Sequence, residues 1–194
     1  MTPEPRAPAA ALAVPAPLAM RRVVAIGIAA LLVAASAQVV VPVPLSPVPM
    51  TLQPLAVIVV GALLGPAAGA AALIVYLMAG VAGLPVFSAG RAGAAWLVGP
   101  TGGYLLAFPL AAAVVGALAS HREGRVPLLR LMVALAAGMV VIHAGGVAHL
   151  ALLGGGPAMA FRIGFVPFVT GDLLKIGLAA AVVLLAGPAL RSRL

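Results

Sequence analysis

The sequence has no cysteine among its 194 residues and very little charge. Disulfides, iron–sulfur clusters and zinc–thiolate sites are therefore excluded, and cysteine usage indicates no redox compartment. Only 7% of the residues are charged, with three acidic residues and a single lysine, whereas soluble domains carry about 25%. Hydrophobic residues make up 64% of the chain, and the mean hydropathy is +1.27. This composition indicates an integral membrane protein with one membrane domain.

The formal net charge of +8 raises the question of a nucleic-acid partner. The chain has no basic patch interleaved with aromatic residues, and basic loops in membrane proteins more often report orientation. We therefore expect membrane lipid around the chain and no nucleic-acid partner.

The N-terminal segment, residues 1–20, is rich in proline and alanine and lacks helical periodicity. We expect it to be a disordered cytoplasmic tail, followed by a single membrane domain over residues 21–194. Two arginines and an apolar run to about residue 41 come next. A signal peptide cleaved at Ala-Ser-Ala, residues 35–37, is one interpretation. A first membrane helix is favoured, because the run reaches the roughly 20 residues that a span requires.

Segments rich in glycine and proline separate the remaining apolar runs. The six runs expected to cross the membrane cover about residues 23–41, 53–64, 67–83, 101–120, 126–153 and 171–189. Gly65-Pro66 is expected to break the chain between the second and third runs. The second run is short for a span, so it is expected to tilt or to extend into the preceding loop. Five prolines within residues 41–54 exclude a regular helix there.

The positions of the arginines are consistent with this count. With the N-terminus inside, only Arg91 and Arg162 fall on the outer side. The inner side receives Arg6, Arg21, Arg22, Arg122, Arg125, Arg130, Arg191 and Arg193. This asymmetry is typical of cytoplasmic loops. The sequence thus predicts an all-α bundle of six transmembrane helices with both termini cytoplasmic.

The same topology places three irregular connections on the outer face, namely residues 41–53, 84–100 and 154–170. Lipid cannot satisfy the N–H and C=O groups of irregular backbone, so such segments are buried or line a cavity. We therefore expect a ligand cavity under the outer loops.

Asp172 and Lys175 lie near the start of the last apolar run, three residues apart and hence on one side of a helix. They could form a simple ion pair. Ionisable groups within membrane segments are costly, however, and usually face a bundle interior or a pathway. A ligand with both an N–H donor and an anionic group would suit this carboxylate and ammonium.

Arg91 and Tyr104 are weaker candidates. Arg91 stands between small residues in "SAGRAG", where a ligand carboxylate could meet it closely, although a solvated loop arginine or a headgroup contact would look the same. Tyr104, in "GPTGGY", is either an interface-belt residue or a cavity wall.

Small residues recur at four-residue spacing in the first apolar run, as Ala25 with Ala29 and Ala30 with Ala34. This spacing permits close helix approach, and it leaves internal packing and docking of a partner helix equally open.

Catalysis is not expected, because only one acidic residue lies within the apolar runs. Intramembrane enzymes generally need paired carboxylates, a metal cluster or an activated serine–histidine pair. His143 and His149 are six residues apart and do not share a helix face well, so we interpret both as packed or network histidines. We therefore expect no catalytic residue, no metal and no cofactor.

The motifs "PVPMTLQ", "GALLGP", "GLPVF", "GPTGGY" and "GDLLK" occur in this order. In this combination the chain resembles the BioY family, the biotin-binding S components of energy-coupling factor (ECF) transporters. The resemblance covers about residues 42–112 and returns at "GDLLK". It implies a six-helix bundle that binds biotin under its outer loops, with Asp172, Lys175 and Arg91 contacting the ligand. Gln53 and Thr51, in the matched "MTLQ", are further candidates in the capping loop.

The resemblance also implies a role in high-affinity biotin uptake across the bacterial cytoplasmic membrane. The first helix would dock on a transmembrane T component that couples to two cytoplasmic ATPases, through the alanines named above. The chain has no nucleotide-binding motif of its own, so ATP hydrolysis would belong to these partners. An S component for another small vitamin is the alternative.

Overall fold

The computed structural model describes residues 16–44, 46–120 and 126–191. Within these residues the chain is mostly helical. The α-helices are α1 (Ala16–Ser36), α2 (Gln53–Val81), α3 (Ala95–Val98), α4 (Gly102–Ala119), α5 (Leu128–Leu150), α6 (Gly156–Gly164) and α7 (Val169–Arg191). Two-residue strands, β1 (Val40–Val41) and β2 (Met50–Thr51), pair antiparallel.

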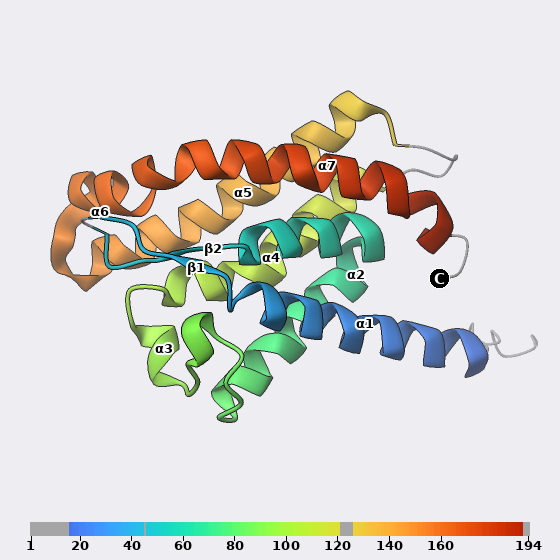
Figure 1. The fold of residues 1–194 in the computed structure, drawn as a ribbon, viewed down its shortest axis with the longest axis horizontal. Coiled ribbons are helices and arrows are strands. Elements are labelled where there is room, and N and C mark those ends of the chain that lie inside the picture. Colours follow the sequence, from blue (N-terminus) through green and yellow to red (C-terminus); the bar gives the residue numbers. More distant parts are fainter. Residues whose placement is uncertain (1–15, 45, 121–125, 192–194) are drawn as a thin grey trace, which may run out of the picture.

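The long helices run side by side in a bundle (Figure 1). The start of α1 and the end of α7 lie at one end of this bundle, whereas α3, α6 and the loop between β1 and β2 lie toward the other. We call the latter the loop end. The irregular segments predicted to share one face are therefore gathered at the same end of the molecule.

The chain reverses within α2, at the break predicted for Gly65-Pro66. Gly65 has φ 78°, outside the helical range, and Pro66 follows it. A Cβ atom on Gly69 would lie 3.1 Å from the Cα atom of Gly61, although eight residues of straight helix span about 12 Å. The two parts of α2 therefore form a helical hairpin (Figure 1), and Gly61 and Gly69 allow them to approach closely.

Close approach of α4 to its neighbours also depends on glycine. A Cβ atom on Gly116 would lie 2.5 Å from the backbone at Gly65 and Pro66, where α2 turns. A Cβ atom on Gly103 would lie 2.3 Å from the carbonyl oxygen of Gly145 in α5. Small residues allow such backbone contacts between membrane helices. They bring α2, α4 and α5 together around a buried core.

Among the described residues, four helical stretches are long and apolar enough to cross a membrane, counting α2 as one and the stretch from α5 to α7 as one. The segment 41–54 contains no α-helix except for the first residues of α2, as its prolines predicted. The segment 154–170 differs from expectation, because it contains α6 and a 3-10 turn, Val166–Phe168. Pro157 lies in the first turn of α6, where its missing N–H costs no hydrogen bond.

Helix α1 differs from the expectation in two respects. It begins at Ala16, inside the segment expected to be disordered, and it ends at Ser36 rather than near residue 41. Residues 1–15, the remainder of that expected tail, lie outside the described residues. Ala29 and Ala30 are buried in the chain's own core, so internal packing, and not docking of a partner, accounts for these two residues. Ala25 and Ala34 are half-buried.

Candidate ligand-binding site

A cavity at the loop end is enclosed by segments that are distant in sequence. Residues 48–51, 53 and 54 supply one wall through the β1–β2 loop and the start of α2, and residues 87, 88 and 96 contribute from the connection that contains α3. The other walls come from α4, α5, the turn before α7, and α7 itself. The polar lining side chains are Thr51, Gln53, Ser88, Trp96, Thr101, Tyr104, His143, Asp172 and Lys175. Five of the six residues predicted to bind a ligand thus share one cavity.

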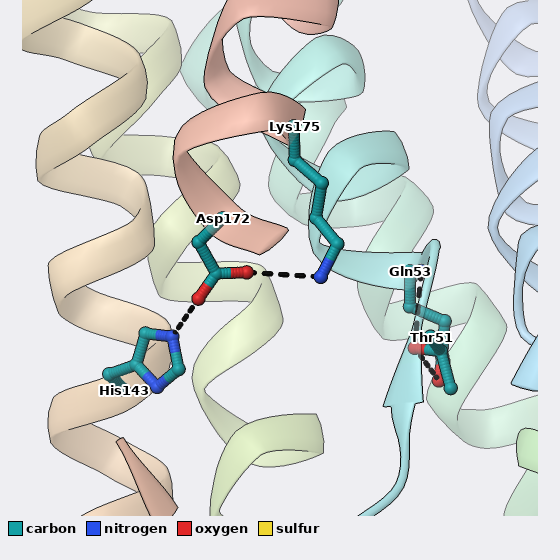
Figure 2. A network of polar contacts seen from close by, with 5 residues as sticks. All are labelled: Thr51, Gln53, His143, Asp172 and Lys175. Carbon is teal, nitrogen blue, oxygen red and sulfur yellow. Dashed lines mark hydrogen bonds and ion pairs between the residues drawn. The ribbon is translucent and has the colours of Figure 1, made fainter. Parts of the chain in front are cut away.

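Asp172 stands at the centre of a buried trio of ionisable side chains (Figure 2). Its Oδ1 accepts a hydrogen bond from Lys175 Nζ at 3.0 Å, and its Oδ2 lies 2.5 Å from Nε2 of His143. Asp172 and Lys175 project from the first turns of α7, and His143 reaches them from α5. We name these three residues the Asp172 trio. The predicted pairing of Asp172 with Lys175 is present, and His143 extends it across two helices.

The Asp172 trio retains unused hydrogen-bonding capacity. A carboxylate can accept about four hydrogen bonds and an ammonium donates three. Among the described residues, the polar contacts recorded for Asp172 are those with His143 and Lys175, and Lys175 contacts Asp172 alone. Both side chains line the cavity. A ligand there can therefore donate to the carboxylate and accept from the ammonium at the same time.

Thr51 and Gln53 form a second polar group, whose hydrogen bonds lead to other groups of the protein. The hydroxyl of Thr51 accepts the backbone N–H of Gln53 and donates to its Oε1, both at 3.2 Å. The amide nitrogen of Gln53 donates to Tyr76 Oη at 2.6 Å, and that hydroxyl donates to the carbonyl of Val86 at 3.2 Å. We name this chain of contacts the Gln53 chain. It joins the start of α2 to its second half and to the segment that follows.

Tyr104 lines the cavity, so of its two sequence interpretations the cavity wall is correct. Its hydroxyl donates to the carbonyl of Gly164 at 2.6 Å, which joins α4 to the end of α6. Its ring stands edge-on to His143, with centroids 6.0 Å apart. Tyr104 therefore holds the walls together around the Asp172 trio.

Arg91 is not brought into the lining of the cavity. Its side chain is exposed, and its guanidinium lies 4.3 Å from the ring centroid of Trp96. Trp96 does line the cavity. Arg91 is therefore separated from the Asp172 trio, and it borders the cavity through a cation–π contact with a wall residue.

Apolar side chains make up the rest of the lining. The rings of Phe87, Phe108 and Phe168 contribute, together with Met50 and Ile142. Such walls suit an apolar ring system, while a few polar groups fix its orientation. The described residues include no group of three His, Asp or Glu side chains placed to hold a metal ion. The arrangement fits a small, neutral-to-anionic organic ligand with a polar head.

His143 and Trp96 are lining residues that the sequence did not assign to the site. Trp96 belongs to α3 and lies in the cavity wall. The contact between His143 and Asp172 joins residues 29 positions apart. The only signal for it in the sequence was the rarity of acidic groups, which left His143 a single carboxylate to pair with inside the bundle.

Comparison with known proteins gives concordant results. Residues 8–192 match the sequence model of the BioY family. The chain is 41% identical over 165 residues to the "Biotin transporter BioY" of Thermotoga maritima, covering 85% of this chain and 95% of that protein. It is 37% identical over 141 residues to the "Biotin transporter BioY" of Rhizobium etli, covering 69% and 75% of the two chains.

A solved structure has the same fold. It is the crystal structure of the S-component for biotin from an ECF-type ABC transporter, with a TM-score of 0.78 and 22% sequence identity. The match covers 88% of this chain and 93% of that one. Together with the apolar helices, these findings identify a membrane protein of the transporter class. The chain belongs to the BioY family.

Proposed function

We propose that this chain binds biotin in the cavity at the loop end and serves biotin uptake as the S component of an ECF transporter. The observation that carries the proposal is the buried Asp172–Lys175 pair, which faces the cavity with unused donors and acceptors. The membership of the chain in a family whose members are named biotin transporters supports the same ligand.

The chemistry of biotin matches the polar lining. Its ureido head has two N–H donors and one carbonyl acceptor, its thioether ring is apolar, and its valerate ends in a carboxylate. The carboxylate of Asp172 accepts a ureido N–H, and Lys175 donates to the ureido oxygen. The fused rings lie against Phe and Trp side chains of the wall. The valerate carboxylate then extends toward Arg91, the exposed cation beside Trp96.

The membrane topology we propose has six spans and cytoplasmic termini in the bacterial cytoplasmic membrane. The hairpin within α2 supports the count, since its two parts run in opposite directions. Each part of α2 is shorter than a typical transmembrane helix. We propose that each part crosses the membrane together with the irregular backbone that continues from its end inside the protein. The arginines support the orientation. Arg21 and Arg130 belong to the starts of α1 and α5, and these helix starts lie away from the loop end. Arg162 belongs to α6 and Arg91 to the connection before α3, and both of these elements lie at the loop end.

The partners we propose are a transmembrane T component and two cytoplasmic ATPases, which would hydrolyse ATP on behalf of this chain. Helix α1 remains the docking element, through its exposed face and not through its buried alanines. Val24, Ile28 and Leu31 are 52%, 63% and 70% exposed and lie on one face of the helix. Ala25 and Ala34 border the face that packs on the bundle.

Equilibrium binding to the detergent-purified chain tests the proposal. We expect saturable biotin binding that excess riboflavin and thiamine do not compete, because neither offers a ureido head with an aliphatic carboxylate. Binding of another vitamin in place of biotin would favour the alternative, an S component for that vitamin. Absence of binding to folded protein would contradict the assignment of biotin.

A further inference from the structure

His143 is a buried histidine that the sequence indicated only as a packed or network residue, and its contacts make it both. Only 8% of its surface is exposed, and its Nε2 lies 2.5 Å from Oδ2 of Asp172. An aspartate beside a lysine is a carboxylate and therefore an acceptor at this contact. Nε2 of His143 must then carry the proton and donate it.

The other ring nitrogen of His143, Nδ1, is buried and has no hydrogen-bond partner among the described residues. The hydrogen bond to Asp172 is therefore the polar contact that orients the ring. The titratable groups next to the imidazole are Asp172 of α7, which Lys175 also contacts, and Tyr104 of α4, whose hydroxyl donates to the carbonyl of Gly164. The geometry thus places a donated proton on Nε2 of His143.

Aromatic rings fix the direction in which this proton points. Phe165 stands edge-on to the imidazole at 5.0 Å between centroids, and Tyr104 stands edge-on at 6.0 Å. Phe168 packs on it at 6.0 Å. These rings come from α4 and from the segment that leads into α7, so the imidazole cannot swing away from Asp172 without moving that segment.

The carboxylate of Asp172 is therefore held at both oxygens, by Lys175 at Oδ1 and by His143 at Oδ2. The terminal torsion of an aspartate has a broad preference of its own. With one oxygen released, the carboxylate plane can rotate about that torsion. With both oxygens held, the free lone pairs keep one direction in the cavity.

We propose that His143 is a positioning residue for the ureido head of biotin: its Nε2–H fixes the plane of the Asp172 carboxylate so that the free lone pairs meet the ureido N–H. The inference rests on the proposed function. It makes His143 a determinant of selectivity for the ureido group, acting through Asp172 and not through its own contact with the ligand.

A matched pair of substitutions separates positioning from packing. In H143Q, the amide nitrogen takes the place of Nε2 and can still donate to Asp172. In H143M, the side chain has similar length and volume but no donor. Binding of biotin, of 1′-N-methylbiotin and 3′-N-methylbiotin, and of biotin methyl ester is measured by calorimetry on the full chain. The N-methyl ligands each lack one ureido N–H, whereas the ester changes only the carboxylate.

We expect H143M to bind biotin about 10- to 100-fold more weakly, the size of one charge-assisted hydrogen bond. Its preference for biotin over the N-methyl ligands should shrink, while its preference over the methyl ester stays that of the parent. H143Q retains the donor, so its ratio of affinity for biotin to affinity for each analogue should stay within about threefold of the parent's ratio. If H143M does not fold, H143N provides the comparison, since its amide is too short to reach Asp172.

Two results would overturn the inference. One is an equal loss for all four ligands in both H143M and H143Q, which would make His143 a packing residue. The other is parent-like binding by H143M. Failure of the proposed function would look different, because the parent chain itself would then not bind biotin.

Discussion

The two polar groups of the cavity, the Asp172 trio and the Gln53 chain, are both buried but differ in what they leave unbonded. In the Gln53 chain each hydrogen bond leads to another protein group and ends at the backbone carbonyl of Val86. In the Asp172 trio, the carboxylate and ammonium retain acceptors and donors that face the cavity. Figure 2 shows Asp172 and His143 on one side of the Lys175 ammonium and Thr51 and Gln53 on the other. Gln53 can also form further hydrogen bonds, since its amide has a second N–H and a second acceptor lone pair. The two groups therefore differ in charge: only the Asp172 trio offers the unused capacity of a buried carboxylate and a buried ammonium. Burial alone does not identify a ligand site, whereas unused capacity on buried charged groups does.

The comparison predicts that substitutions in the Asp172 trio reduce ligand affinity and that substitutions in the Gln53 chain reduce stability. The largest effect is expected for Asp172→Asn. The amide keeps the shape but loses the charge and half of the acceptor capacity, so biotin affinity should fall about 100-fold or more. Calorimetric titration measures this, with Thr170→Ala as a control at an exposed position of α7. A variant that folds and binds like the parent would exclude Asp172 from the site.

Lys175→Met keeps the aliphatic stem and removes the ammonium. We expect biotin affinity to fall about 10- to 50-fold, because the ureido oxygen loses its donor and Asp172 keeps only His143 as a partner. Titration with biotin and with biotin methyl ester locates the loss. Equal losses for both ligands would support contact with the ureido head. A loss seen for biotin but not for its ester would assign Lys175 to the valerate carboxylate and contradict the pairing proposed with Arg91.

Gln53→Leu should have the opposite effect, with a loss of stability larger than its loss of biotin affinity. It removes the donor to Tyr76 and the acceptor for Thr51, so we expect unfolding to become easier by about 1–3 kcal/mol. The folded fraction should bind biotin within about tenfold of the parent. Thermal unfolding and titration on the same sample give both numbers.

The control for that variant is Tyr76→Phe, which removes the next member of the Gln53 chain. If the residues act as one connected unit, the double variant should lose less stability than the sum of the two single losses. A loss of affinity larger than the loss of stability in Gln53→Leu would make Gln53 a ligand contact.

The smallest effect is expected for Tyr104→Phe. It removes the hydrogen bond to Gly164 but keeps the ring against His143, so stability should fall by about 1 kcal/mol and affinity by about fivefold or less. Gly146→Ala is a harsher test of the same wall. A Cβ atom there would lie 2.1 Å from the ring of Tyr104 and would have to displace it. Unchanged binding in Gly146→Ala would show that the ring position does not matter.

Sequence reasoning was most successful where local chemistry decides the outcome. The Gly65-Pro66 break and the prolines of residues 41–54 determine backbone conformation directly, and both predictions are confirmed. The pairing of Asp172 with Lys175 follows from helical periodicity, and the structure contains it. Thr51 and Gln53 became candidates only through the resemblance to the BioY family, and Tyr104 stayed open between the membrane interface and a cavity wall, because no local pattern brings these residues together.

The remaining features depend on packing that no local pattern specifies. The contact of His143 with Asp172 requires α5 to lie against the start of α7, and α6 forms within a segment that reads as irregular. Ala29 and Ala30 could not be assigned to either face of α1, because small residues serve internal packing and docking equally well. The stacking of Arg91 on Trp96 depends on a loop whose turns include glycines with positive φ at positions 90 and 93.

The most direct test of the central claim is a structure of this chain determined with biotin bound. We expect the ureido ring in the cavity at the loop end, with an N–H donating to Asp172, the ureido carbonyl accepting from Lys175, and His143 still donating to the Asp172 carboxylate. Biotin bound elsewhere, or in the cavity with its ureido ring away from an unchanged Asp172–Lys175 pair, would contradict it.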